Sequence, residues 1–156
     1  MQSTEHSQGS SVHPGWFVVA LQILLLVERS GGGKVCSSGE LAEQLHSHAV
    51  FLRRVFSYLV RAGIAEAREG REGGYLLARP AEQITLAEVY RALQSTGSSP
   101  IPPLELPRGL TLEPNLCTAF GVIGAEIEAS ILKTLGRYTL ADLMERAQVS
   151  PVSEER

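Results

Sequence analysis

The segment from residue 48 to residue 61 separates its side chains into two faces. At 100° per residue, the apolar side chains share one face of a helix: Leu52, Val55, Phe56 and Leu59. The opposite face carries Val50, Arg53, Arg54, Ser57 and Arg61. The pattern predicts an amphipathic helix that must bury one face in a core. Its basic outer face is either simply solvated or meets an anionic partner.

A shorter helix is predicted just before this segment. Ser37 to Glu40 has the Ser-x-x-Glu spacing of a capping box, and the apolar residues Leu41 and Ala42 follow it. We expect a helix over residues 38 to 45, with a turn formed by residues 46 to 48. Two helices joined by so short a turn are typical of a helix-turn-helix.

A β-hairpin is predicted immediately after the basic helix. Residues 64 to 68 (IAEAR) and 75 to 79 (YLLAR) are strand-like, and the glycine-rich EGREGG separates them. A helix-turn-helix followed by a hairpin is a winged helix, in which the second helix enters the major groove. Gly70, Gly73 and Gly74 are expected to let the tip turn and approach DNA closely, with Arg71 supplying charge.

The rest of the chain is predicted to be mainly helical. Residues 1 to 13 are polar and expected to be disordered, and Pro14 begins an apolar helix to about Arg29 that should be buried on nearly all sides. The expected domains are a winged helix-turn-helix over residues 14 to 95, a linker over 96 to 115, a long helix with a terminal helix over 116 to 147, and a disordered tail over 148 to 156.

The charge distribution favours an anionic partner for one part of the chain. The net charge is −3, but residues 46 to 79 contain six arginines and three glutamates. The longest apolar run, residues 16 to 27, is well short of the ~20 residues that span a bilayer. It is not expected to be a signal peptide, because residues 1 to 15 contain no Lys or Arg and no small-residue cleavage site follows the run. We therefore expect a cytoplasmic protein without a membrane partner.

Four segments of the sequence match a known pattern: SSGELAEQL (37 to 45), FLRRVFSYLVRAGI (51 to 64), GREGGYLLARPAEQITLAEVYRAL (70 to 93) and TLADLM (139 to 144). With these segments the sequence resembles the BadM/Rrf family of winged-helix transcriptional regulators. It implies a dimeric repressor or activator that binds an operator in double-stranded DNA. Where this chain has Glu69, the family often has arginine. The difference implies that the wing binds DNA phosphates less strongly or recognises a different DNA sequence.

Many family members hold an iron–sulfur cluster through three cysteines placed before the long final helix. The corresponding stretch here, residues 95 to 117, contains only Cys117. One thiolate cannot supply the ligands of a cluster, so no cofactor is expected. The EPNLC spacing resembles the cluster-free, YwnA-like branch of the family instead.

The long helix expected over residues 116 to 136 carries an apolar stripe at spacings of 4, 3, 4 and 4: Leu116, Phe120, Ile123, Ile127 and Ile131. The stripe could pack inside the same chain, against residues 16 to 27, or against a second copy. Operator recognition by a twofold dimer favours the second copy, so these residues are the expected dimerisation surface.

The resulting assignment gives each part of the winged helix a role on DNA. Val50, Arg53, Arg54 and Ser57 are expected to read bases, with Arg61 and Arg71 on phosphate. Ser38 and the turn histidines His46 and His48 are expected on the DNA backbone. Two histidines without a third ligand are weak support for a metal, so no metal site is expected.

Alternative functions remain open. The net negative charge and Glu69 suit a winged helix that docks an acidic protein, and a small-molecule effector would differ only in what the dimer interface holds. An enzyme is not expected, because GGGK (31 to 34) lacks the residues of a phosphate-binding loop and no nucleophile and base pair is apparent.

A thiol-based redox switch is a further hypothesis. Cys117 is expected in the first turn of the long helix, with Asn115 as a cap, and Cys36 precedes its own capping box. The simpler interpretation is that both are small buried hydrophobic residues.

If Cys117 is the sensor, oxidant should release wild-type protein from DNA and leave a Cys117→Ser variant bound, as measured by fluorescence anisotropy. Equal release of both proteins would remove Cys117 from the mechanism.

Overall fold

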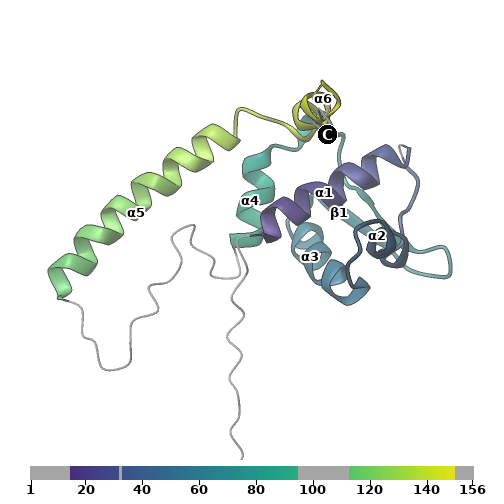
Figure 1. Ribbon diagram of the computed structural model, residues 1–156, viewed down its shortest axis with the longest axis horizontal. Helices are drawn as coiled ribbons and strands as arrows, with labels where there is room; N and C mark the ends of the chain where they lie inside the picture. Colours follow the sequence, from purple (N-terminus) through teal and green to yellow (C-terminus); the bar gives the residue numbers. More distant parts are fainter. Residues whose placement is uncertain (1–14, 32, 95–112, 150–156) are drawn as a thin grey trace, which may run out of the picture.

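The computed structural model describes residues 15–31, 33–94 and 113–149. The predictions for residues 1 to 13, for Pro14, for most of the linker and for residues 150 to 156 lie outside these ranges. The elements in chain order are α1 (Trp16–Arg29), α2 (Ser38–Gln44), α3 (Ala49–Arg61), β1 (Ala65–Arg68), β2 (Gly74–Leu77), the 3-10 turn η1 (Ala81–Gln83), α4 (Leu86–Gln94), α5 (Pro114–Leu135) and α6 (Leu140–Val149). The predicted winged helix, mainly α with a small hairpin, is confirmed (Figure 1).

The core lies where α1, α3 and α4 meet the hairpin. The four apolar residues predicted on the inner face of α3 are all fully buried. Phe56 stacks face to face on Tyr75 of β2, with ring centroids 3.8 Å apart. This contact joins the helix to the wing, so burial of the inner face also fixes which way the outer face points.

Helix α1 is less enclosed than its composition predicts. Ala20, Ile23, Leu24 and Val27 are buried, but Val18 keeps 62% of its surface exposed and Gln22 is exposed as well. The prediction that α1 is buried on nearly all sides was therefore wrong, because its main packing partners, α3, α4, α6 and β2, leave one side open.

The wing is anchored by a third extended segment that the sequence did not reveal. Strands β1 and β2 pair antiparallel, with Ala65 opposite Leu77. On the other edge of β2, Cys36 and Tyr75 exchange two backbone hydrogen bonds of 2.9 and 2.8 Å. Gly74 lies against this bridge with φ +156°, and a Cβ there would collide with the backbone of Cys36. The fold itself therefore requires glycine at this position.

Capping boxes begin three of the helices. The Ser37 and Glu40 pair predicted from the sequence is present, and Thr85 with Glu88 and Thr139 with Asp142 repeat it at α4 and α6. The first residues of the last two capping boxes, Thr85 and Thr139, also face each other in an antiparallel β-bridge. Leu86 donates its N–H to the carbonyl of Tyr138 at 2.9 Å, and Leu140 donates to Ile84 at 2.8 Å.

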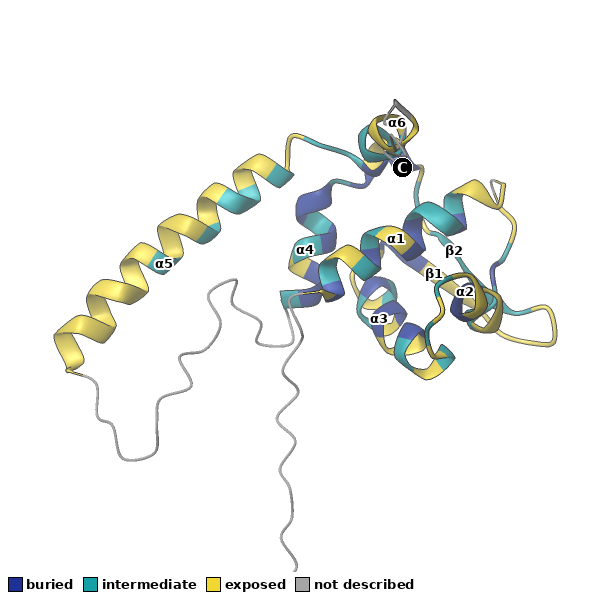
Figure 2. Cartoon of the chain, viewed as in Figure 1, coloured by how far each residue is buried: buried dark blue, intermediate teal, exposed yellow. Residues whose placement is uncertain are grey.

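Helix α5 stands apart from this domain. It begins at Pro114 and is capped by the side chain of Glu113, so the predicted cap at Asn115 was wrong. Its main packing partner is α4 rather than α1. Within the described residues, α5 has none that is fully buried (Figure 2). Its length and composition alone would suffice to cross a membrane, although it carries Glu126, Glu128 and Lys133.

Replacing Gly74 should show that glycine is needed for the close packing of β2 against Cys36. Because an added methyl group would collide with the backbone of Cys36, Gly74→Ala should lower the free energy of unfolding by about 1–3 kcal/mol. Gly39→Ala is the matched control: it lies in α2 with only an ordinary contact nearby, and alanine there should be neutral or stabilising by up to ~1 kcal/mol. Urea denaturation measures both, and equal effects would contradict the assignment.

Candidate nucleic-acid interface

The outer face of α3 is exposed as predicted. Val50 keeps 70% of its surface exposed, and Arg53, Ser57 and Arg61 are also exposed. Its first turn carries no acidic residue. The helix therefore presents an apolar methyl pair, a hydroxyl and guanidinium groups along one side.

Arg54 is held differently from Arg53. Its guanidinium lies 5.4 Å from the centroid of the Trp16 ring, a cation–π geometry. The hydroxyl of Ser57 donates to the carbonyl of Arg54 at 2.6 Å. Trp16, at the first turn of α1, thus restricts the directions in which Arg54 can point, a role that the sequence pattern did not reveal.

The turn before α3 places its histidines at the surface. His46 adopts a left-handed conformation with φ +48°, and His48 is the residue that precedes the first turn of α3. Ser47 donates its backbone N–H to Ala42, which closes the turn. Both histidines are exposed, and Ser38 is half-buried in the first turn of α2.

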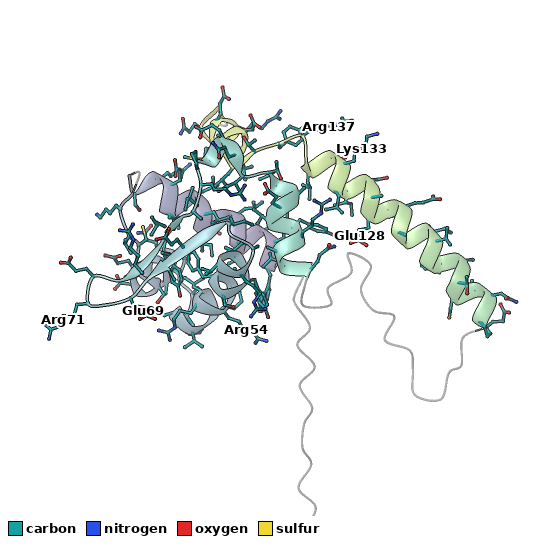
Figure 3. All side chains as sticks on the ribbon, turned by 180° about the vertical axis from the view of Figure 1, so that it is seen from behind. Arg54, Glu69, Arg71, Glu128, Lys133 and Arg137 are labelled. Atoms are coloured by element: carbon teal, nitrogen blue, oxygen red, sulfur yellow. The ribbon has the colours of Figure 1, made fainter. Side chains whose placement is uncertain are left out.

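The tip of the wing carries charges of both signs. Gly70 has φ +109° and accepts a hydrogen bond from Gly73, which makes the reversal. Arg71 extends from this tip, and Glu69 lies close to it along the chain (Figure 3). In the same view, Arg54 lies at the lower edge of the winged domain, on the same side as Glu69 of the wing. The wing is thus a projecting loop with one arginine between two glutamates, Glu69 and Glu72.

The root of the wing is fixed by Arg79. Its guanidinium donates to the carbonyl of Gln83 at 3.1 Å and to the carboxylate of Glu88 at 2.9 Å. Glu88 also accepts from the backbone N–H and hydroxyl of Thr85. Burial acts to raise the pKa of the Glu88 carboxyl, but the hydrogen bonds from Thr85 and Arg79 outweigh it and lower this pKa below its ordinary value.

Arg61 lies at the far end of α3 from the turn. Its guanidinium is 5.9 Å from the centroid of the Tyr58 ring. Arg61 and Arg91 of α4 both line a shallow hollow between the two helices. The only acid of this hollow among the described residues is Glu88, which is already paired with Arg79. The basic surface therefore continues from α3 onto α4.

The cysteines do not form a site for an iron–sulfur cluster. Cys36 is buried with its backbone in the wing sheet, whereas Cys117 is exposed in the first turn of α5. These are the only two cysteines of the chain, and within the described ranges no three His, Cys, Asp or Glu residues gather as metal ligands would. The residues present do not fit a cluster, whose usual ligands are thiolates. The expectation that all cysteines are buried was wrong for Cys117.

A protein-family match covers most of the chain. The model of the Rrf2 family, described as an iron-dependent transcriptional regulator, matches residues 16–146. The chain belongs to the Rrf2 family. The predicted family is therefore confirmed, including its winged-helix fold.

Individual relatives agree with this membership. The transcriptional regulator IscR of Cereibacter sphaeroides is 39% identical over 79 residues, which is 51% of this chain and 50% of IscR. The protein rrf2 of Nitratidesulfovibrio vulgaris is 27% identical over 135 residues, 83% of this chain and 85% of that protein. The chain spans about half the length of the first curated relatives that it matches.

Among solved structures, the global cysteine regulator CymR of Bacillus subtilis shares the fold. Its TM-score is 0.60 at 23% identity, and the alignment covers 87% of this chain and 97% of CymR. At this identity the likeness concerns the fold alone.

The Arg79 and Glu88 pair should make stability depend on pH. Because the pKa of Glu88 is lowered by folding, its contribution is present above the unfolded pKa of ~4.3 and is lost as the pH falls through the folded value. Glu88→Gln should cost about 1 kcal/mol at pH 7 and progressively less below pH 4. The exposed Glu82→Gln is the control. A cost that does not vary with pH in urea titrations would contradict this role.

Proposed function

We propose that this protein is a homodimeric DNA-binding transcriptional regulator acting in the cytoplasm, most simply as a repressor. The observation that carries the proposal is the outer face of α3, where Val50, Arg53 and Ser57 are exposed on a helix whose inner face is fixed in the core. Family membership supports the same function, because the family and its member IscR are described as transcriptional regulators. No catalytic step is part of the proposal.

Recognition would divide between α3 and the wing. In the major groove, Arg53 suits a bidentate contact to guanine, and Val50 suits an apolar contact to a thymine methyl group. Arg54, steered by Trp16, would read a neighbouring base, and Ser57 lies next to it. Arg61 and Arg71 would contact phosphates, as would Ser38, His46 and His48 around the turn.

The wing would grip the DNA weakly. Its single tip arginine is flanked by Glu69 and Glu72, and Arg68 is already near Glu66 at 3.6 Å. Gly70 and Gly73 would let the tip pass close to the backbone or minor groove, whereas Gly74 is already required by its contact with the backbone of Cys36. A phosphate contact by Arg71 adds affinity without sequence information, so specificity would rest mainly on α3.

The second copy would be held by α5. Leu116, Phe120, Ile123 and Ile127 keep 44–52% of their surfaces exposed, which is unusual for large apolar side chains aligned on one helix. Two copies joined this way would present two α3 helices to an operator with two half-sites.

Two rival functions would show themselves in the same measurements. Docking of an acidic protein would use the basic face of α3 without sequence preference for DNA. A thiol switch would use Cys117, which is accessible, more readily than Cys36, which is buried. A cluster-free state is part of the proposal, whereas an activator role and a small-molecule effector are its alternatives.

The first test is a fluorescence-anisotropy titration of reduced protein against DNA from directly upstream of its own gene, at two salt concentrations and with scrambled competitor. Nanomolar binding that survives competitor is expected for a specific regulator. Equal, salt-sensitive binding to every sequence would instead favour the protein-partner function.

Arginine variants should separate base reading from phosphate contact. Arg53→Ala should cost about 1–3 kcal/mol on the operator and relax its sequence preference, and Arg54→Ala should act similarly. Arg71→Ala should weaken all sequences alike and reduce the salt slope by about 1.

Arg137→Ala provides the control, because Arg137 lies next to the junction of α5 and α6, away from the wing tip (Figure 3). If Arg54→Ala left both affinity and sequence preference intact, the placement of the reading face would be wrong.

A further inference from the structure

The single tryptophan of the chain lies against one side of α3. Trp16 is the first residue of α1 and keeps only 8% of its surface exposed. Its ring meets Phe51 edge to face with the centroids 5.3 Å apart, and it makes a tilted contact with Tyr58 at 6.1 Å. The guanidinium carbon of Arg54 lies 5.4 Å from the centroid of the same ring. Because Phe51, Arg54 and Tyr58 follow at helical spacing, they form one side of α3.

The ring of Trp16 is itself held in place. Phe51 contacts it from the turn of α3 before Arg54, and Tyr58 contacts it from the turn after. On its own helix, Ala20 and Ile23 have no exposed surface, so the start of α1 is anchored in the core. A ring restrained in this way attracts a neighbouring guanidinium toward one defined place.

The adjacent arginine lacks this support. Arg53 and Arg54 are both exposed on the outer face of α3. Within the described ranges, the arginines that lie over an aromatic ring are Arg54, Arg61 and Arg146, and Arg53 is not among them. An arginine side chain has much rotamer freedom to lose when it binds. Two side chains of the same type on one face therefore differ in freedom before any DNA is bound.

This difference in freedom bears on how strictly each arginine selects a base. A mobile guanidinium that meets the wrong base can turn to another acceptor, such as a phosphate oxygen, and recover its hydrogen bonds. A restrained guanidinium cannot turn as readily, so its donors stay unpaired against the wrong base. Specificity is the difference between the two binding energies, and restraint therefore increases it.

We infer that Trp16 is a positioning residue for sequence recognition. By holding the guanidinium of Arg54, Trp16 makes the base pair that Arg54 reads more strictly selected than the base pair that Arg53 reads. The inference rests on the proposed function and deepens it, because it assigns part of the specificity to α1. Trp16 itself does not read a base and acts through Arg54. A purely structural Trp16 would support the packing of α1 on α3 without changing base choice.

The restraint on Arg54 is measurable without DNA. In the full chain, nitrogen-15 relaxation of the arginine Nε–Hε groups should show Arg54 more ordered than Arg53 on the picosecond to nanosecond timescale. The difference should disappear in Trp16→Leu and shrink in Trp16→Phe, whose ring attracts a cation less strongly. Equal order of the two arginines in the wild-type protein would overturn the inference.

Base selection is the decisive readout. The reduced full-length protein is offered a pool of double-stranded DNA with a randomised centre, and the bound DNA is sequenced. The positions read by Arg53 and Arg54 are those that lose their preference in Arg53→Ala and Arg54→Ala. Trp16→Leu should reduce the preference at the Arg54 position by about two- to fivefold and leave the Arg53 position unchanged. Affinity for scrambled DNA should change less than about twofold, because no charge is removed.

The neighbouring residue supplies a matched control. Phe17 is also an aromatic residue in the first turn of α1, but its ring packs edge to face on Tyr90 of α4, with the centroids 5.5 Å apart. Phe17→Leu therefore removes an aromatic contact of α1 and should leave both base preferences unchanged. The double variant of Trp16→Leu with Arg54→Ala should select no less strictly at the Arg54 position than Arg54→Ala alone. Trp16→Phe should give an intermediate preference, and it provides the test if Trp16→Leu is poorly folded.

The outcomes separate this inference from the proposed function. Specific binding with the Arg54 position unchanged in both Trp16 variants would contradict the inference and leave the regulator standing. The same loss of preference in Phe17→Leu would show that general packing is responsible, which would also contradict it. No sequence preference in the wild-type protein would contradict the regulator and with it the base selection assigned to Trp16, whatever order the relaxation measurement finds for Arg54.

Discussion

Burial of the inner face of α3 is the constraint on which the rest of the domain depends. Leu52, Val55 and Phe56 have no exposed surface, and Phe56 lies flat on Tyr75 of the wing. Because a helix side is fixed once its opposite side is packed, the same apolar contacts that stabilise the fold orient Arg53 outward. Stability and recognition are therefore carried by opposite sides of one helix, and changes on one side need not disturb the other.

The wing combines a fixed base with a projecting tip. One edge of β2 is joined to Cys36 by paired backbone hydrogen bonds, and the end of the hairpin is held by Arg79 through Gln83 and Glu88. Between these anchors, the tip around Arg71 is exposed. Such an arrangement gives a loop a defined position while leaving its outermost residues free to adjust to the shape of a bound surface.

The elements that local pattern determines were predicted from the sequence, and those that depend on distant contacts were not. The two faces of α3, the capping box at Ser37 and the hairpin all follow from spacing within a few residues. The bridge from Cys36 to Tyr75 and the contact of Arg54 with Trp16 join residues nearly forty positions apart, and no local pattern encodes them. Gly74 illustrates the difference, because the sequence marked it as special but gave the reason as DNA, whereas the fold supplies a reason of its own. The DNA contacts themselves remain predictions.

The pairing of the starts of α4 and α6 changes where the folding unit ends. Leu86 and Leu140 donate their backbone hydrogen bonds across to Tyr138 and Ile84, so residues far beyond the linker complete the structure at the base of the wing. A fragment that stopped after α4 would lack Leu140 and so expose the core residues that this side chain covers. It would also leave the backbone carbonyl of Ile84 and the N–H of Leu86 without their hydrogen-bond partners. Helix α5 runs from its exposed amino-terminal half back toward α4, and α6 then closes the winged domain (Figure 1). Any force applied to α5 is consequently transmitted to a domain that holds the helix at its carboxyl end through α6.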